Sequence, residues 1–211
     1  IPFEAAKKSI EDSLGKRIED IFKSFDKEPI GKASIGVVYQ AELLSGEKVV
    51  VKIRRPEIVQ DIETDFSIMM FLTLQAEKAS EEIKYLGISR ILKDFSIRLQ
   101  NELNFNIEAL NTDRIKTTIS KHDPDKLFVI PRVYKDFLKE NIIVMDKLDG
   151  IPFTNISKIK KENKNVINCL ESGVKIFINS FLQEGFFHAD LHGGNFFLLE
   201  GNRIGLIDFG L

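Results

Sequence analysis

The feature that most constrains this chain lies near its C-terminal end, where polar residues recur at fixed spacings. Residues 188–195 read HADLHGGN, and residues 208–210 read DFG. Between them, residues 195–199 predict a strand, residues 200–202 (Glu-Gly-Asn) predict a turn, and residues 203–207 predict the returning strand. A hairpin of this kind would place Asn195 and Asp208 side by side, at the ends of two paired strands.

These residue types suit phosphoryl transfer, and the pattern resembles the catalytic half of a protein-kinase-like active site. Asp190 would accept the proton of an attacking hydroxyl or orient a water. Asn195 and Asp208 would hold Mg²⁺ at the nucleotide phosphates, since this ion takes few protein ligands and shares the rest with phosphate and water. His188, Asp190 and His192 could instead form a transition-metal site, but that leaves Asn195 and the DFG residues without a role.

The N-terminal half carries a matching pair of strands with a lysine. Alternation predicts strands over residues 35–44 and 48–53, joined by a turn at 45–47. Lys52 ends the run VVVK, where we expect it to contact the α- and β-phosphates, although a lysine at a strand end is usually only solvated. Before these strands lies a loop of small residues that lets backbone amides approach an anion: Gly31, Lys32, Ala33, Ser34, Ile35 and Gly36.

Lys52 requires a carboxylate partner on a helix. Apolar residues at three- and four-residue steps predict one long helix over residues 90–119, and Glu102 and Glu108 on it are the candidates. A strand over 141–146 would lead into a hinge, where the backbone of Met145 and Lys147 contacts adenine.

Apolar periodicity, together with helix-breaking residues, predicts further helices and strands. Helices are expected over residues 3–14, 16–25, 57–77 and 163–183, with a break at 79–87 and a strand at 129–134. The apolar stripe on the third of these helices is typical of core: Phe66, Met69, Met70 and Leu74. The inward face of the last is predicted to hold Val166, Leu170, Val174, Phe177, Ile178 and Phe181.

Taken together, the N-terminal and C-terminal motifs make the chain resemble the UbiB family of atypical kinases, also called AarF-domain kinases. The resemblance extends from about residue 14 to residue 211. The motifs that carry the resemblance are FDKEPI at 25–30, ASIG at 33–36, VVVKIRRP at 49–56, ELNFNIEA at 102–109 and HADLHGGN at 188–195. The resemblance implies an ATP-binding kinase-like fold, often with ATPase activity, associated with ubiquinone biosynthesis and with lipid or quinone handling at membranes.

The resemblance assigns roles residue by residue. Lys52 matches the nucleotide-binding lysine and Glu108 its helical partner, while Asp190 matches the catalytic aspartate. Asn195 and Asp208 match the metal ligands. The chain departs from the family at Asn104, where the E-x-D element has its second acid, and at Gly31 and Lys32, which replace alanines. The family's N-terminal K-x-G-Q element is not found in this sequence.

The fold class expected is therefore α+β, a two-lobed protein-kinase-like fold with an antiparallel N-lobe sheet, helical insertions and a partial, mostly helical C-lobe. We expect an N-terminal helical extension at 1–25, the N-lobe at 26–146 and the partial C-lobe at 147–211. Because the sequence ends one residue after DFG, it is expected to be a fragment of a longer protein.

Net charge and cysteine content limit the kinds of partner and compartment expected for this chain. A net charge of −2 argues against a nucleic-acid binder, and the single cysteine, Cys169, fits a reducing compartment. The expected cofactors are ATP and Mg²⁺. The resemblance adds quinone-biosynthesis proteins or lipid as partners, and a cytoplasmic or peripheral-membrane location, with membrane association through parts outside this sequence. The alternatives are a small-molecule phosphotransferase of the aminoglycoside or choline kinase kind, and a nucleotide-binding pseudokinase scaffold.

Overall fold

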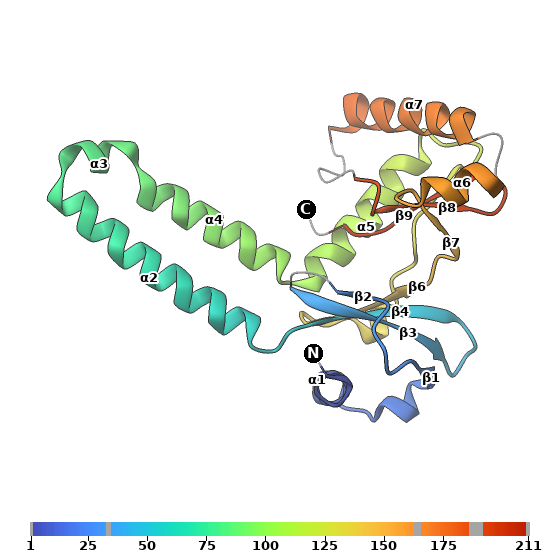
Figure 1. The fold of residues 1–211 in the computed structure, drawn as a ribbon, viewed down its shortest axis with the longest axis horizontal. Helices are drawn as coiled ribbons and strands as arrows, with labels where there is room; N and C mark the ends of the chain where they lie inside the picture. The colour runs from blue at the N-terminus through green and yellow to red at the C-terminus, as the bar shows by residue number, and fades with distance from the viewer. Residues whose placement is uncertain (1, 33–34, 163–165, 186–191, 210–211) are drawn as a thin grey trace.

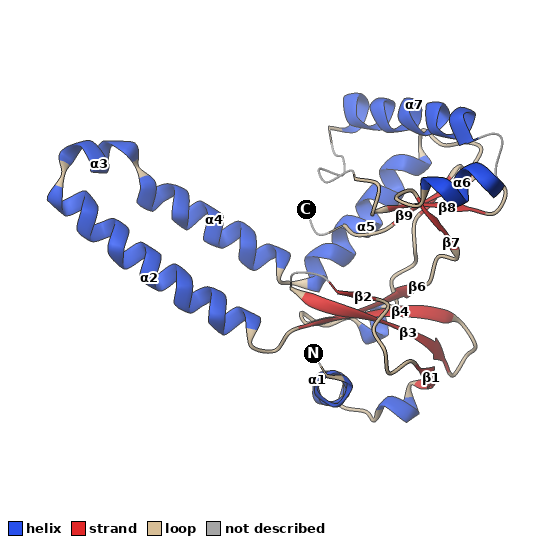
Figure 2. Cartoon of the chain, viewed as in Figure 1, coloured by secondary structure: helices blue, strands red, loops and turns tan. Residues whose placement is uncertain are grey.

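Two small sheets organise the chain, one in each of two lobes, and a long helical hairpin projects to one side (Figure 1). The computed structural model describes residues 2–32, 35–162, 166–185 and 192–209. Helices and antiparallel strands both contribute, so the predicted α+β class is confirmed (Figure 2).

The N-lobe sheet has the strand order β1-β3-β4-β6, with β2 added on β3, and all its pairings are antiparallel. Its strands are β1 (Phe22–Phe25), β2 (Gly31–Lys32), β3 (Gly36–Leu43), β4 (Lys48–Arg54) and β6 (Ile142–Asp146). The predicted β3–β4 hairpin is confirmed.

The two faces of this sheet differ because side chains alternate along each strand. Val49, Val51 and Ile53 are fully buried on the face that packs against α1 (Phe3–Leu14). Val50 and Lys52 point to the opposite face, toward the C-lobe. The sheet therefore has one core face and one face available to a ligand.

The predicted helix over residues 16–25 is wrong. A short 3₁₀ turn at Ile18–Asp20 leads directly into β1, where Phe22 pairs with Leu43 and Phe25 with Ala41. Pairing with β3 and packing of the phenylalanine rings outweigh the weak helical preference of this segment.

The projecting hairpin consists of α2 (Ile58–Ala79), α3 (Glu81–Leu86) and α4 (Ile88–Glu102). None of the residues in these three helices is buried. The expectation that the α2 stripe is core is therefore wrong, since Met69 is 39% exposed and Leu74 is 43% exposed. The helices α2 and α4 pack mainly on each other, and such a two-helix layer cannot enclose its apolar side chains. The predicted break at 79–87 reduces to Ser80 and Gly87 on either side of α3.

The predicted single helix over 90–119 is also wrong, because it is interrupted before α5 (Phe105–Ser120). Asn104 adopts an extended conformation, and its side-chain oxygen accepts a hydrogen bond from the backbone N–H of Asn106 at 2.9 Å. Asparagine at this position caps a new helix. The interruption lets α5 turn away from α4 and lead from the N-lobe sheet to the C-lobe, where it lies near α7 (Figure 1).

The C-lobe sheet has the strand order β5-β9-β8-β7. Its strands are β5 (Phe128–Val129), β7 (Gly150–Pro152), β8 (Phe196–Leu199) and β9 (Arg203–Leu206). The predicted hairpin near the C-terminus is confirmed as β8–β9, with Phe196 opposite Leu206 and positive φ at Gly201 and Asn202 in its turn. The strand predicted over 129–134 shortens to β5 and an isolated bridge between Val133 and Met145. A 3₁₀ turn at Lys135–Phe137 precedes β6.

The C-lobe helices are α6 (Ile156–Glu162) and α7 (Val166–Glu184). The predicted inward face of α7 is largely wrong: Val174 is 56% exposed, while Cys169, Gly173 and Ser180 are buried. A Cβ on Gly173 would lie 2.7 Å from Ile204 Cδ1. Small residues therefore let α7 approach the sheet closely, whereas Leu170, Val174, Ile178 and Phe181 stay partly exposed beside it. Among the described residues, no helix combines the length and apolar character that a bilayer crossing requires.

Candidate functional site

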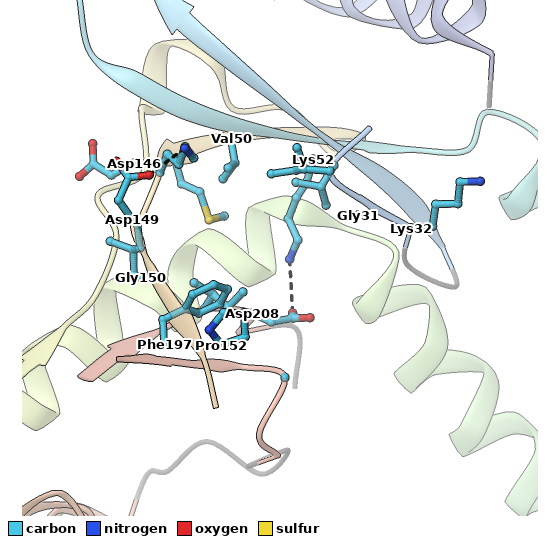
Figure 3. A pocket seen from close by; sticks show the side chains of 17 residues that line it. Gly31, Lys32, Val50, Lys52, Asp146, Asp149, Gly150, Pro152, Phe197 and Asp208 are labelled. Carbon is cyan, nitrogen blue, oxygen red and sulfur yellow. Dashed lines mark hydrogen bonds and ion pairs between the residues drawn. The ribbon is translucent and has the colours of Figure 1, made fainter. Parts of the chain in front are cut away.

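A cleft of about 550 Å³ lies where the ligand-facing side of the N-lobe sheet meets the C-lobe strands (Figure 3). The residues that line it come from β2, β3, β4, the end of β6, the segment into β7, and the β8–β9 region. They are Ile30, Gly31, Lys32, Val38, Val50, Lys52, Met145, Asp146, Lys147, Leu148, Asp149, Gly150, Pro152, Gly194, Phe197, Ile207 and Asp208.

Lys52 is the cation at one end of this cleft. Its Nζ lies 2.5 Å from Oε1 of Glu108 and 3.3 Å from Oδ1 of Asp208, and Figure 3 shows it pointing down toward Asp208. β4 supplies the lysine, and the first turn of α5 supplies the glutamate. Of the two predicted partners, the structure therefore brings Glu108 to Lys52, whereas Glu102 ends the preceding helix α4.

Burial and neighbouring charges shift the pKa values of Lys52 and Glu108 in opposite directions. Burial lowers the pKa of Lys52, but the carboxylates of Glu108 and Asp208 outweigh that effect and raise its pKa above the ordinary value. Burial raises the pKa of Glu108, and the Lys52 ammonium opposes that rise. Lys52 therefore stays charged at neutral pH, as a group that binds phosphate must.

Asp208 follows β9 and faces the cleft, and its side chain is 49% exposed. Its φ of 68° is in the left-handed region, which aspartate tolerates better than most residues. The next side chain, Phe209, is fully buried, and its carbonyl oxygen accepts a hydrogen bond from Asn111 of α5 at 3.1 Å. These contacts with α5 hold Asp208 in place while its carboxylate remains accessible.

Asn195 lies beside this point but is 6% exposed. Its backbone N–H donates to the carbonyl oxygen of His192, and its own carbonyl accepts from the N–H of Ile207 at 2.9 Å. The hairpin thus brings the backbones of Asn195 and the Asp208 segment together, as the spacing predicts.

The hinge runs from Met145 to Asp149. The N–H of Lys147 donates to the carbonyl oxygen of Lys48 in β4, so a base could use only the carbonyl of that residue. The two carboxylate oxygens of Asp146 accept hydrogen bonds from Tyr134 Oη at 2.9 Å and from the Arg132 N–H at 3.0 Å. This fixes the hinge from outside the cleft. The Lys147 ammonium, by hydrogen bonding, lowers the pKa of Asp149 at the rim.

The described residues of the loop at 31–36 lie in different surroundings. Gly31 and Lys32 line the cleft, whereas Ile35 packs against the cluster around Phe105. A Cβ on Gly36 would collide with the carbonyl oxygen of Ile53, so this glycine permits close β3–β4 pairing. Ala33, Ser34 and Asp190 lie outside the described residues.

Sequence reasoning missed several apolar walls of the cleft. Val38, Val50, Pro152, Phe197 and Ile207 line it. For Val50, the signal was available, because it lies two residues before Lys52 and so shares its face of β4. Pro152 and Phe197 carry no such signal, since they reach the cleft only through the pairing of β7 with β8.

Within the described ranges, no group of three or more His, Cys, Asp or Glu side chains gathers as a metal site. The alternative transition-metal site has two of its members, His188 and Asp190, outside those ranges. The Asp208 carboxylate and the Asn195 amide carry oxygens of the kind that Mg²⁺ prefers, and this ion completes its shell with phosphate and water.

Comparison with known sequences places this geometry among kinase-like proteins. The model of the ABC1 atypical kinase-like domain matches residues 1–211. A protein named "Probable protein kinase UbiB" from Pseudomonas aeruginosa (strain UCBPP-PA14) is 34% identical over 197 residues, which is 93% of this chain and 36% of the relative. A protein of the same name from Marinobacter nauticus is 32% identical over 214 residues, covering 100% of this chain and 39% of the relative. The chain thus spans well under half the length of these relatives, and the resemblance to the UbiB family is confirmed.

A solved structure supports the same grouping. The complex of Rv3197 with erythromycin from Mycobacterium tuberculosis superposes with a TM-score of 0.77 at 25% sequence identity. The match covers 100% of this chain and 51% of that chain. The predicted kinase-like fold is therefore confirmed.

Proposed function

This chain belongs to the ABC1 atypical kinase-like family, and we propose that it binds ATP with Mg²⁺ in the cleft and catalyses phosphoryl transfer or ATP hydrolysis. The observation that carries the proposal is Lys52, held at one end of the cleft between Glu108 and Asp208. A fixed cation next to an accessible carboxylate suits a metal-bound polyphosphate.

The shape of the cleft supports a nucleotide rather than a phosphate alone. Its volume of about 550 Å³ is within the range of small-molecule sites. Val38, Val50 and Phe197 give it apolar walls, which suit a flat base. The hinge backbone adjoins those walls and offers polar groups to the base edge, while Lys52 and Asp208 receive the phosphates.

The chain's own residues take separate roles in this proposal. Lys52 binds and orients the α- and β-phosphates, and Glu108 keeps its ammonium aimed into the cleft. Asp208, with Asn195, would hold Mg²⁺, which would neutralise phosphate charge when bound. Asp190 is assigned from the motif alone, as the residue that accepts a proton from the acceptor hydroxyl or orients a water.

Because the relatives are named as UbiB kinases, we extend the proposal to ubiquinone or other isoprenoid-lipid metabolism. Quinone-biosynthesis proteins or lipids would then be the partners.

Calorimetric titration tests the proposal with ATP and ADP, each with Mg²⁺ and with EDTA, followed by phosphate release without an added acceptor. We expect Mg²⁺-dependent binding that is lost in Lys52→Met and kept in Lys23→Met, which removes an exposed cation paired with Glu42. Phosphate release without acceptor favours ATP hydrolysis, and binding without release favours transfer to an acceptor. Absence of binding by the wild-type chain would refute the proposal.

A further inference from the structure

At its C-terminal end, strand β4 carries two cations, Lys52 and Arg54, that contact the start of α5 and the residue before it. Lys52 and Arg54 are two residues apart, so their side chains leave the strand on the same side. Lys52 reaches Glu108 in the first turn of α5. Arg54 Nη1 donates a hydrogen bond to the carbonyl oxygen of Leu103, the first residue after α4.

The Leu103 carbonyl is one of the groups that the end of α4 leaves without a helical partner. A cation at a helix C-terminus also meets the negative end of the helix dipole. The Arg54 guanidinium both donates to this carbonyl and places a positive charge at the C-terminal end of α4. It thereby ties the joint between the two helices to the same strand that holds Lys52.

Two further contacts define the joint, and neither involves β4. The N–H of Phe105 donates to the carbonyl oxygen of Glu140 at 3.0 Å, and the Asn104 side chain caps α5. The projecting hairpin offers little additional support, because no residue of α2, α3 or α4 is buried. The start of α5 also packs on the sheet through Phe105 and Ala109, which share a buried cluster with Ile143, Met145 and Val50. Lys52 and Arg54 add the polar contacts from β4, and of these two only Arg54 acts at the joint itself.

We propose that Arg54 is a positioning residue for phosphoryl transfer, acting through α5: by holding the Leu103 carbonyl, it places Glu108 so that Lys52 is aimed at the phosphates. The inference rests on the proposed function for its kinetic consequences. Its structural consequence, the placement of the first turn of α5, can be measured without nucleotide.

The first test compares Arg54→Met, Arg54→Lys and the surface control Lys23→Met at saturating Mg·ATP. A displacement of about 1 Å at a reacting group can lower a rate by roughly a hundredfold, so we expect Arg54→Met to lower turnover by about tenfold to a hundredfold. Arg54→Lys keeps a donor and should recover part of the loss, and Lys23→Met should match the wild type. Wild-type turnover in Arg54→Met would overturn the inference.

A double-mutant cycle separates positioning from simple destabilisation. If Arg54 acts through Glu108, the doubly substituted Arg54→Met/Glu108→Gln protein should turn over ATP no more slowly than Glu108→Gln alone. Losses that multiply would show that Arg54 works independently of Glu108 and would contradict the inference.

Hydrogen exchange gives a readout that needs no nucleotide. In Arg54→Met, the amides at the start of α5 should exchange at least about tenfold faster, while those of β3 should keep wild-type protection. If the wild-type chain neither binds nor turns over ATP, the proposed function fails, and this measurement alone decides whether Arg54 positions the first turn of α5. Unchanged protection of α5 would then refute it.

Discussion

Removing the charge of Lys52 should make the stability of this chain depend more steeply on pH. In Lys52→Met, the Glu108 carboxylate keeps its buried place, with its side chain 5% exposed, and loses its nearest cation. Breaking a buried ion pair by deleting one partner costs about 3–5 kcal/mol, because the other charge stays uncompensated. We expect a loss of that size at pH 8.

The loss of stability in Lys52→Met should become smaller as the pH falls. Burial already raises the pKa of Glu108 in the wild type, and Lys52 opposes that rise, so its removal raises the pKa further. A carboxyl with a higher pKa in the folded state binds more protons folded than unfolded. Stability then falls as pH rises through that window and recovers below it. In the wild type, the raised pKa of Lys52 does not make stability vary with pH near neutrality. The stabilisation that it contributes is fully present at every pH below the pKa of this lysine in the unfolded chain.

Two companion variants sharpen the test. Glu108→Gln leaves Lys52 with Asp208 at 3.3 Å, so the cost should be about 1–3 kcal/mol, the range for one lost buried partner. Lys52→Met/Glu108→Gln removes both charges and should be more stable at pH 8 than Lys52→Met alone. Urea unfolding followed by circular dichroism between pH 5 and 8 measures all three. A pH-independent loss in Lys52→Met, or additive losses in the double variant, would refute this reasoning.

Three further predictions follow from single contacts. Gly36→Ala should lower the urea midpoint in unfolding experiments, because the added Cβ meets the Ile53 carbonyl; an unchanged midpoint would mean that β3 and β4 separate at little cost. Asp208→Asn should weaken binding of Mg·ADP about tenfold or more in calorimetry while leaving the melting temperature of the apo chain nearly unchanged; equal affinity would remove Asp208 from metal binding. Cys169 should react with a thiol reagent only on unfolding, because burial raises its pKa and the thiol donates to the Asn202 carbonyl oxygen; rapid labelling of the folded chain would contradict this.

The sequence predicted best those parts that depend on local spacing. The β8–β9 hairpin follows from a turn rich in Gly and Asn between two apolar runs, and the β3–β4 pair from alternation and a Gly-containing turn. The VVVK motif at residues 49–52 predicted Lys52 as the lysine that contacts the phosphates, and the structure places this side chain in the cleft. From periodicity alone Glu108 was one of two candidate acids, and only the family resemblance selected it. The choice depends on where α5 begins, and a single asparagine sets that point.

The predictions that failed depend on distant packing. Periodicity identified the apolar stripes of α2 and α7, but it does not report which neighbours cover them. On α7 the face that packs on the sheet is the one with the small residues Cys169 and Gly173, because they permit close approach. In residues 16–25, pairing with β3 decided the conformation, and no local signal encodes a partner about twenty residues away.

The most direct test of the central claim is an experimental structure of this chain with Mg²⁺ and a non-hydrolysable ATP analogue. The account predicts the base against Val50 and Met145, the phosphates at Lys52, and the metal at Asp208. A nucleotide bound elsewhere, or a Lys52 that keeps no contact with any phosphate, would contradict it.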